Sequence, residues 1–554
     1  LPMESAIVIA GLICVFIVGS VYARRERIRR AYRIVRKKFG QEPDPADFDY
    51  KEISMYWNAV REEALHPLDD LTWGDLDMSR IYERMNQCQS FAGEQYLYAL
   101  LRDVSQDTAS LEKIEEKMCY LEENEREREE VQVKLMALGK RDSSYYLPQV
   151  LNEIEDFQIG HGWFYRLMQA LLFLSLAGAV ILRNVYGMTA FGMIFICNLC
   201  IYAVMKQKYE IHLELMESVR GLIYTGRELT KGTSGGYEKR FGEISAHVAQ
   251  LGETEKRLRK ATVRRQAGMR GDAMELFATY LTGATLIDFT MYNQAIRQLK
   301  RKMEHFKKVY RLVGELDALI SVVSFRKSLP HYCLPKFSQD ACIHLEGLYH
   351  PLLNEPVLND VVMDRNSIVT GSNASGKSTF IKAVTVNCIL AQTIHTCMAG
   401  IAEIPHAYVA TSMAVKDSLM EGESYYMKEI RSLNRMLGYM QENELVVCAI
   451  DEILRGTNTK ERIAASAAIL RYLEERNCLV LVASHDMELV DLLDREYEHY
   501  YFCEQEGEED IVFDYKIHKG INEKMNAIRL LEYVGFPGQI VSDAERIYQM
   551  LASE

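Results

Sequence analysis

The sequence predicts a multidomain protein of mixed class, α in its first part and α/β in its last. Three uncharged apolar runs of transmembrane type occur before residue 206, and periodic segments of helical type surround them. After about Pro335, short apolar runs typical of buried strands alternate with helical segments. The 554 residues are enough for several domains. We therefore expect a helical region with three transmembrane helices, followed by an α/β domain.

The composition argues against two classes of protein. The net charge is −13, so any surface for nucleic acid would have to be local. The twelve cysteines form no regular framework, and several stand in apolar stretches where a thiol behaves as a small hydrophobe. Cys197 and Cys200 form a C-x-x-C, but it lies inside an apolar run, which argues against redox or zinc chemistry. These features indicate a reducing compartment.

The three apolar runs are Ser5–Ala23, Leu167–Leu182 and Gly187–Met205. A helix of such length suits the ~30 Å hydrocarbon layer of a membrane, and the aromatic residues at 163–165 suit its interface. The second and third runs are separated by only "RNVYG", which predicts a tight helical hairpin.

Charge predicts the orientation of these helices. The segment Arg24–Lys38 carries nine Lys and Arg and one Glu, and "KQKYE" follows the third run. The positive-inside tendency then places the N-terminus outside and everything from Lys206 onward in the cytoplasm of a multi-pass cell-membrane protein.

Alternatives remain open for each run. A cleaved signal peptide carries its positive charge before the apolar run rather than after it, which disfavours that interpretation of the first. The other two runs are also compatible with a buried hairpin of a soluble protein, because Arg166 and Asn198 interrupt the apolarity. The basic segment after the first run is suited to binding anionic lipid.

Helical periodicity dominates the polar part before residue 336. One segment carries apolar residues at Leu111, Ile114, Met118 and Leu121, the stripe of an amphipathic helix. The expected organisation is an N-terminal anchor with a basic segment, a first helical part, a transmembrane hairpin, a second helical part and an α/β domain, over residues 1–40, 41–162, 163–205, 206–335 and 336–554.

A phosphate-binding loop is predicted near the start of the α/β domain. Gly371–Ser378 spells G-x-x-x-x-G-K-S between an apolar run and a helical pattern, and a plain Gly/Ser-rich turn would not need this complete spacing. Backbone N–H groups and the helix N-terminus favour phosphate there. Lys377 would reach the β- and γ-phosphates, and the Ser378 hydroxyl would hold Mg²⁺. The candidate nucleotide ligands are Gly371, Ser372, Asn373, Ala374, Ser375, Gly376, Lys377, Ser378 and Thr379.

Acidic partners follow at the end of a later strand. Leu445–Ile450 is an apolar run suited to a strand buried on both faces, and Asp451 and Glu452 stand at its carboxyl tip. Asp451 would bind Mg²⁺, and Glu452 would orient and deprotonate the attacking water, which favours hydrolysis. A further strand ends at His485, in position to contact the γ-phosphate, although a His after a strand is often structural.

Four segments in this order make the sequence resemble the ATPase of the MutS DNA mismatch-repair family: "TGSNASGKST", "SYYMKEI", "IDEILRGTNT" and "ASHDMEL". "HKGINEKMNAIRLLEYVGFPGQIVSDAERI" is similar to the closing segment of that family, and "SFAGEQYLYALL" to the start of its helical core. The resemblance covers roughly residues 56–160 and 206–554 and is most specific after Gly347.

The resemblance implies an ABC-type P-loop ATPase domain with C-terminal dimerisation helices, using ATP and Mg²⁺. It implies a homodimer in which Ser424 completes the site of the partner, and Asn373 reaching the γ-phosphate. The implied catalytic residues are Glu452, Lys377, His485 and Ser424, and the implied metal ligands are Ser378 and Asp451.

The departures from that family are also informative. The chain has no room before its helical part for the mismatch-reading domain of that family with its Phe-x-Glu wedge. The L-S-G-G-Q signature of ABC-type ATPases is also absent, which argues against a transport subunit. Phe241, Gly242 and Glu243 have the right letters but lie among residues of the helical core. Membrane spans are not part of the pattern, so mismatch-specific recognition of DNA is not expected.

Three functional hypotheses follow. The first is a membrane-anchored, dimeric MutS-like ATPase that couples its nucleotide cycle to DNA or a partner. The others are an ABC-type transport subunit and a membrane scaffold that does not act on DNA. Small GTPases are disfavoured, because no N-K-x-D stretch is present. Candidate DNA contacts are the basic segments Glu255–Gln266 and Arg297–Lys308, with a solvated helix face as the alternative.

Overall fold

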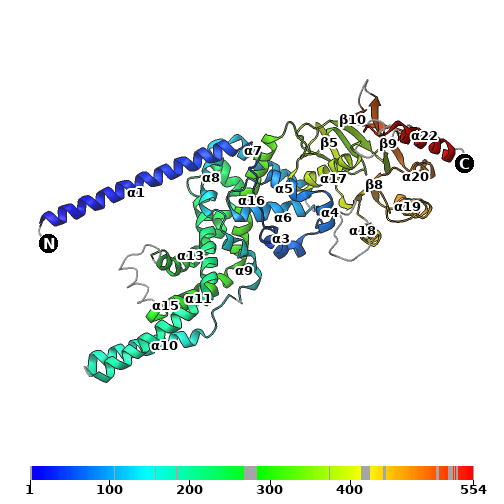
Figure 1. The fold of residues 1–554 in the computed structure, drawn as a ribbon. Helices are drawn as coiled ribbons and strands as arrows, with labels where there is room; N and C mark the ends of the chain where they lie inside the picture. Colours follow the sequence, from blue (N-terminus) through cyan, green and yellow to red (C-terminus); the bar gives the residue numbers. More distant parts are fainter. Residues whose placement is uncertain are drawn as a thin grey trace. The chain divides into compact units, whose positions relative to one another are not determined.

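A computed structural model describes residues 3–104, 107–155, 157–182, 185–267, 283–372, 375–413, 425–440, 444–506, 511–521, 528, 531 and 534–552. The chain forms two compact units (Figure 1). Unit 1 contains Leu1–Glu63, Asn86–Ala99 and Lys117–Ser324, and unit 2 contains Ala64–Met85, Leu100–Glu116 and Phe325–Glu554. Two short segments that precede the hairpin in sequence are therefore part of the same unit as the α/β domain.

Unit 1 is built of helices. Its longer ones, some of which continue beyond the unit, are α1 (Met3–Lys38), α6 (Phe91–Arg102), α7 (Thr108–Glu123), α8 (Glu125–Leu138), α10 (Gly162–Leu182), α11 (Val185–Leu229), α13 (Glu243–Ala267), α15 (Ile287–Arg301) and α16 (Met303–Ser328). Shorter turns of helix are α2 (Tyr50–Ile53), α3 (Met55–Val60), η1 (Arg61–Glu63), η2 (Asp142–Tyr146), α9 (Leu147–Glu153) and α12 (Gly235–Phe241).

Amphipathic periodicity correctly predicted helix α7. Leu111, Met118 and Leu121 are buried and Ile114 is half-buried, while the charged residues between them face solvent or pair with neighbours. Spacings of three and four residues place these apolar side chains on one side of the helix, which is what burial requires.

The start of α6 is fixed by a carboxylate on α16. The backbone N–H groups of Gln89 and Ser90 donate to Asp317, with distances of 2.8 to 3.1 Å, and the Ser90 hydroxyl also donates to it. Asp317 is fully buried, and burial raises its pKa to about 6. Glycine makes the close helix contact possible, because a Cβ on Gly93 would lie 2.3 Å from Asp317 and one on Gly314 would lie 2.7 Å from a backbone oxygen of α6.

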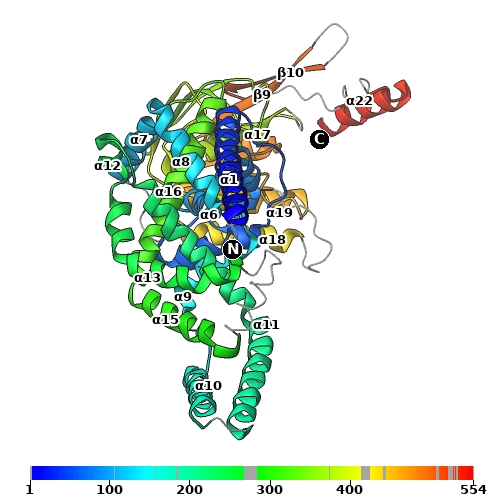
Figure 2. The ribbon, with the colours of Figure 1, turned by 90° about the vertical axis from the view of Figure 1, so that its left-hand side faces the viewer.

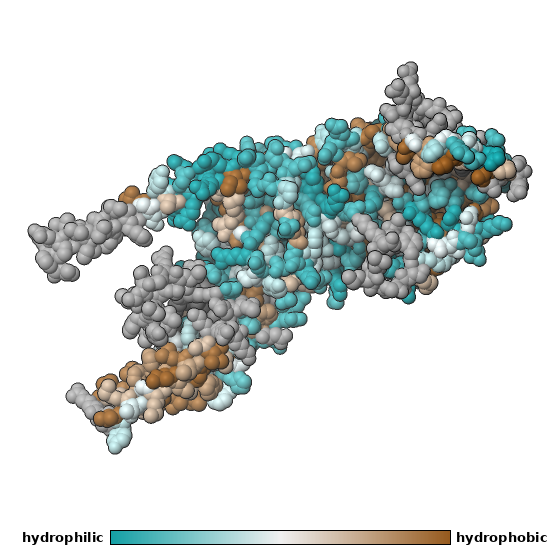
Figure 3. Space-filling model, in the orientation of Figure 1, coloured by the Kyte–Doolittle hydropathy of each residue, from teal (hydrophilic) through white to brown (hydrophobic). Residues whose placement is uncertain are grey.

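Helices α10 and α11 form the predicted hairpin and lie side by side (Figure 2). Two helices in the described part of the chain, Gly162–Ile181 and Val185–Met205, are long and apolar enough to cross a membrane, with mean hydropathies of 1.7 and 2.0. Only 11% and 6% of these two spans are buried within the protein, and apolar side chains cover their surface (Figure 3). The hairpin is therefore not a buried core.

The sequence predicted three such spans, and the described residues contain two. The first predicted run, Ser5–Ala23, lies within helix α1, but its side chains up to Ile17 are outside the described residues. The basic segment that follows it is partly engaged, because Arg36 forms two hydrogen bonds to the Glu129 carboxylate of α8, at 2.6 and 2.7 Å. Helix α11 also does not end at Met205; it continues to Leu229, with non-helical backbone angles at Tyr209.

Two polar residues of the hairpin contact helix α15 or the residues just before it. The Asn198 amide donates to the carbonyl oxygen of Ala284 at 2.6 Å, and the Gln169 amide donates to the Thr290 hydroxyl at 3.2 Å. Asn198 is fully buried. The amide nitrogen of Asn198 is thus satisfied inside unit 1, whereas its Oδ1 has no hydrogen-bond partner among the described residues, and Arg166 is exposed.

Unit 2 contains two sheets. The four-stranded sheet has the order β1-β5-β2-β3, and the six-stranded sheet has the order β10-β9-β4-β8-β7-β6. The strands are β1 (Lys336–Ser338), β2 (Ile343–Leu348), β3 (Asn359–Met363), β4 (Ser367–Thr370), β5 (Ile401–Pro405), β6 (Tyr408–Ser412), β7 (Val446–Asp451), β8 (Cys478–Ala483), β9 (Glu498–Glu506) and β10 (Ile511–Lys519).

The helices of unit 2 are α4 (Asp70–Asp75), α5 (Met78–Met85), α17 (Lys377–Ile394), α18 (Tyr425–Tyr439), α19 (Thr459–Glu474), α20 (Met487–Leu492) and α22 (Gly538–Ala552). In the larger sheet, strands β9, β4, β8, β7 and β6 are parallel, and β10 pairs antiparallel with β9. Every residue of β4, β7 and β8 is buried, which agrees with their continuous apolar sequences.

Candidate functional site

The predicted phosphate loop connects strand β4 to helix α17. Gly371 and Gly376 have φ angles of 144° and 107°, a region that favours glycine. A Cβ on Gly371 would lie 2.9 Å from the backbone oxygen of Phe502 and 2.9 Å from the Ser375 hydroxyl. The two glycines therefore let the loop turn sharply against β9, and the first backbone N–H groups of an 18-residue helix face the loop.

The Lys377 ammonium folds back over this loop. It donates to the carbonyl oxygens of Gly371 and Ser372, at 2.6 and 2.7 Å, and the residue is buried. Ser375 is also buried, while Ser378 and Thr379 are exposed on the first turn of α17. Asn373 and Ala374, two of the predicted ligands, lie outside the described residues, as does Ser424.

The sheet order brings the acidic pair to the same edge as the loop. Strand β8 lies between β4 and β7, and parallel strands present their carboxyl ends on one side. Asp451 ends β7 and is buried, and within the described part of the chain its Oδ1 has no hydrogen-bond partner. A buried carboxylate oxygen without a partner fits the predicted role of Asp451 as a Mg²⁺ ligand.

Glu452 adopts a positive φ of 56° and donates its backbone N–H to the Ala483 carbonyl at 3.0 Å. Its carboxylate forms ion pairs with Arg455 Nε at 2.6 Å and His485 Nδ1 at 3.4 Å. Burial by itself would raise the pKa of Glu452, but the interactions with His485, Arg455 and Lys377 outweigh it, so the pKa lies below its usual value. The carboxylate is therefore ionised and can accept a proton.

His485 follows strand β8 and has its side chain half exposed. The interaction with Glu452 raises the pKa of His485 above its usual value. The next residue is held in place, because Arg462 donates two hydrogen bonds to the Asp486 carboxylate at 3.1 and 2.6 Å. The structure thus brings His485 and Glu452 together, as neighbours along the edge of one sheet.

Two of the motifs that lie far apart in sequence meet on helix α18. The Glu429 carboxylate accepts the backbone N–H of Arg455 at 3.1 Å, and a Cβ on Gly456 would lie 2.8 Å from the Tyr426 side chain. The "SYYMKEI" helix therefore packs directly on the loop that follows Glu452, and this contact needs a glycine at position 456.

A cavity of about 440 Å³ adjoins the loop. Besides Lys377 and Glu452 it is lined mainly by aromatic and apolar residues of strands β2, β3, β9 and β10 and of the turn after β2, among them Tyr349, His350, Val357, Asn359, Phe502 and Tyr515. Burial lowers the pKa of His350 to about 4, helped by the Lys382 charge, so this imidazole is neutral. The sequence analysis did not identify this lining, although the segment "LYHPLL" was the available signal.

Three basic residues of the segments considered for DNA have partners within unit 1. Lys256 pairs with Glu253 at 3.3 Å, Lys302 donates to Gln250 at 3.2 Å, and Lys300 pairs with Glu155. Side chains from residue 260 to 267 lie outside the described residues. Phe241 is buried and contacts Tyr237 in helix α12, so it does not form a free wedge.

These features define a class of protein: one with an α/β domain that presents a glycine loop, a helix N-terminus and an acidic pair at the carboxyl edge of a parallel sheet. Such an edge can bind a polyanion and a divalent cation together, and it supplies a base next to them.

Comparison with known proteins narrows the class. Residues 367–552 match the model for MutS domain V. The DNA mismatch repair protein MutS of Listeria monocytogenes serotype 4b is 28% identical over 284 residues, covering 48% of this chain and 32% of the relative. MutS of Staphylococcus epidermidis is 26% identical over 277 residues, with 48% and 31% covered. MutS of Thermotoga sp. strain RQ2 is 28% identical over 269 residues, with 47% and 33% covered.

The match to MutS domain V and these relatives support membership of the MutS family, as the sequence motifs predicted. The similarity spans about a third of the length of these curated relatives.

Proposed function

We propose that this chain is a MutS-like ATPase that binds and hydrolyses ATP with Mg²⁺ at the edge of its larger sheet. The main support for this proposal is that Lys377, Asp451 and Glu452 lie together at the carboxyl ends of β4 and β7. In this proposal the loop and Lys377 hold the phosphates, Ser378 and Asp451 hold Mg²⁺, and Glu452 takes the proton of the attacking water.

ATP hydrolysis by the purified chain tests this proposal. Lys377→Ala should abolish nucleotide binding, whereas Glu452→Gln should bind ATP and lose roughly 10²- to 10⁴-fold in turnover. Lys460→Ala and Glu475→Gln are matched controls, because both residues are exposed on or next to helix α19. Turnover by Glu452→Gln at the rate of the unaltered chain would remove the assigned base.

We propose further that the active form is a homodimer in which Ser424 of each protomer completes the site of the other. Support comes from the position of Ser424 directly before helix α18, which itself packs on the Glu452 loop. Ser424→Ala and Lys377→Ala are each expected to be inactive alone and to regain activity when mixed, since one composite site per mixed dimer is then intact. Inactive mixtures that contain dimers would contradict the shared site.

The third part of the proposal is a membrane anchor with the ATPase unit in the cytoplasm. The exposed apolar surface of α10 and α11 supports it, because contiguous apolar surface of this size is not kept in water. The first run, Ser5–Ala23, is proposed as the additional span. After fractionation the chain should stay in the membrane pellet through an alkaline wash and be released by detergent; recovery in the aqueous fraction would contradict it.

The ligand that the ATP cycle acts on is proposed to be DNA or a protein near the membrane. The relatives are named DNA mismatch repair protein MutS, and this chain is similar to about a third of their length. Binding to duplex, branched and single-stranded DNA should be measured at rising salt with Glu452→Gln and ATP. For a protein that contacts phosphates, the logarithm of the binding constant falls linearly with the logarithm of the salt concentration. Absence of binding at low salt in both nucleotide states would eliminate DNA.

A further inference from the structure

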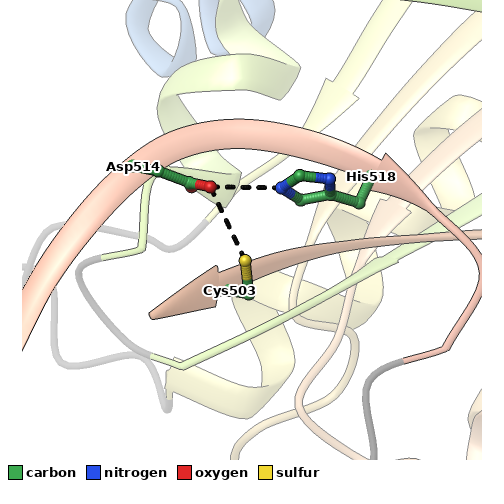
Figure 4. Close-up of side chains that lie close together, drawn as sticks. All are labelled: Cys503, Asp514 and His518. Carbon is green, nitrogen blue, oxygen red and sulfur yellow. Dashed lines mark hydrogen bonds and ion pairs between the residues drawn. The ribbon is translucent and has the colours of Figure 1, made fainter. Parts of the chain in front are cut away.

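A second cluster of metal-ligating side chains lies on the β9–β10 hairpin, away from Asp451. The Cys503 thiol, the Asp514 carboxylate and the His518 imidazole offer ligand atoms that all lie within 4.8 Å of one another (Figure 4). The thiol donates to Asp514 Oδ2 at 3.6 Å, and His518 Nε2 lies 3.2 Å from the same oxygen. All three side chains are partly buried.

An irregularity in strand β10 creates this cluster. The pairing with β9 shifts by two residues between Phe513 and Ile517, so residues 514–516 bulge opposite Cys503. In a regular strand, residues four positions apart would be about 13 Å apart. The bulge, in which Tyr515 has a φ of 53°, instead curls the chain until Asp514 and His518 meet above Cys503.

We propose that Cys503, Asp514 and His518 bind Zn²⁺ with a fourth position left open. Bond lengths to tetrahedral zinc place a sulfur and an oxygen about 3.6 Å apart, and a nitrogen and an oxygen about 3.4 Å apart. The distances from Asp514 Oδ2 to Cys503 Sγ, 3.6 Å, and to His518 Nε2, 3.2 Å, are close to these values. A thiolate with an imidazole selects zinc over Mg²⁺ or Ca²⁺, which prefer oxygen ligands.

The geometry argues against a nucleophilic cysteine. In a Cys–His–Asp relay the imidazole stands between the thiol and the carboxylate. Here the carboxylate is the group that both the thiol and the imidazole contact. That order suits a shared cation, with Asp514 further oriented by the backbone N–H of Lys516, which donates to Oδ1 at 2.9 Å.

The site lies on the opposite face of the hairpin from the cavity. Side chains alternate along a strand, so Phe502 lines the cavity while Tyr501 and Cys503 face the other way, and Tyr501 stacks on His518 at 5.2 Å. The bulge connects the two faces, because Tyr515 lines the cavity and its neighbour Asp514 is a proposed ligand. Bound zinc would therefore hold the Tyr515 wall of the cavity in place, a consequence that rests on the proposed function of that cavity.

Metal content of the purified full chain tests the site. After chelation and dialysis, addition of Zn²⁺ alone should leave one zinc per chain, and Cys503→Ser and His518→Gln should each lose it. Cys342→Ser and His344→Gln are matched controls, since both residues are partly buried in unit 2 outside the cluster, and they should retain the metal. No retained zinc, or equal retention in Cys503→Ser, would overturn the proposal.

Cobalt provides a measurement that needs no variant to fold. Co²⁺ added to the metal-free, unaltered chain should give a thiolate-to-metal charge-transfer band and the intense visible bands of tetrahedral coordination. A weak octahedral spectrum without the thiolate band would overturn the site. ATP affinity is then measured with and without zinc: severalfold weaker binding after chelation is expected, and an unchanged affinity would overturn the effect on Tyr515. Zinc content is measured without ATP. A chain that binds zinc but does not hydrolyse ATP would therefore contradict the ATPase proposal and leave the zinc site standing.

Discussion

At the scale of single residues, the candidate site depends on backbone shape as much as on side-chain chemistry. Gly371, Gly376 and Glu452 all have positive φ, and they occur at the two turns that meet at the sheet edge. Left-handed angles cost residues with a Cβ about 1–2 kcal/mol, so the non-glycine case, Glu452, is held by its surroundings. Its backbone hydrogen bond to Ala483 and its two ion pairs supply that restraint.

Gly371→Ala should abolish ATP binding by the chain. The new Cβ would lie 2.9 Å from a backbone oxygen, and the loop would have to move away from β9 to relieve the clash. The matched change Gly438→Ala, in helix α18 with open space around it, should keep affinity and stabilise the helix by about 0.5–1 kcal/mol. Titration with a fluorescent ATP analogue measures the ATP affinity of the two variants. Wild-type affinity in Gly371→Ala would show that the loop is not the site.

The pH dependence of turnover should reflect His485. Its pKa is raised above the usual 6.5 by Glu452, so protonated His485 persists above pH 6.5 and holds the Glu452 carboxylate in an ion pair. Turnover should therefore rise with pH through an acid limb whose midpoint lies above 6.5. His485→Asn should remove this limb, because no titrating partner of Glu452 remains at that position. An identical profile in the variant would assign the limb to another group.

At the scale of elements, close packing of α6 on α16 organises the helical unit. A glycine in each helix removes the Cβ that would separate them, and the Asp317 carboxylate caps the start of α6. Sequence periodicity predicted the helices but not this crossing, because the pattern identifies a buried face without identifying its partner.

Gly314→Ala should destabilise unit 1, because the added methyl would lie 2.7 Å from the Ala92 carbonyl oxygen. Overpacking of this kind costs about 1–3 kcal/mol. Gly252→Ala, in helix α13 with nothing within 4 Å, is the control and should be neutral or stabilising. Hydrogen exchange of the α6 amides measures the effect locally, and equal protection in both variants would contradict the packing argument.

The Asp317 carboxyl should make stability of the same helices depend on pH. The pKa of Asp317 is raised from 3.8 to about 6, so the folded state favours the protonated carboxyl. The stabilisation that this gives is fully present below pH 3.8 and is lost as the pH rises through 6. The shift corresponds to about 3 kcal/mol between these limits. Stability is measured from the hydrogen exchange of the α6 amides at several pH values, and Asp317→Asn should remove the change between pH 3.8 and 6. An unchanged slope in the variant would assign the pH dependence to another group.

At the scale of the whole molecule, the α/β unit is assembled from three separate stretches of chain. Helix α4 covers the edge strand β6: Asp75 accepts hydrogen bonds from the Thr411 hydroxyl at 2.7 Å and from the Met413 N–H at 3.1 Å. Arg326 is buried and forms two hydrogen bonds to Glu115, at 2.8 and 2.7 Å. Unit 2 therefore requires residues that precede the α10–α11 hairpin in sequence.

A chain restricted to residues 336–554 should fail to fold as unit 2 does. It would expose the edge of β6 and leave the Thr411 and Met413 donors without Asp75, and exposed strand edges promote aggregation. Co-expression of residues 64–116 should restore soluble material. A soluble, cooperatively melting 336–554 fragment by itself would show that the earlier segments are dispensable.

The sequence by itself determined the local features of this protein. The loop from Gly371 to Ser378, the acidic tip of β7, the apolar hairpin and the stripe of α7 each depend on residues close together in the chain, so spacing and periodicity reveal them. The similarity to MutS domain V followed from the same short motifs. Arg166 and Asn198 left the hairpin open to two interpretations, because a polar residue in an apolar run has a meaning only once its partner is known.

Only the tertiary structure decided what these features meet. It placed Asn198 on the Ala284 carbonyl, Glu429 on the loop after Glu452, and α4 on the edge of β6. It also formed the cavity wall and the cluster around Cys503, which depends on a bulge that shifts the pairing of two strands. Contacts between distant segments are set by packing and strand register, and neither quantity is encoded in any short stretch of sequence.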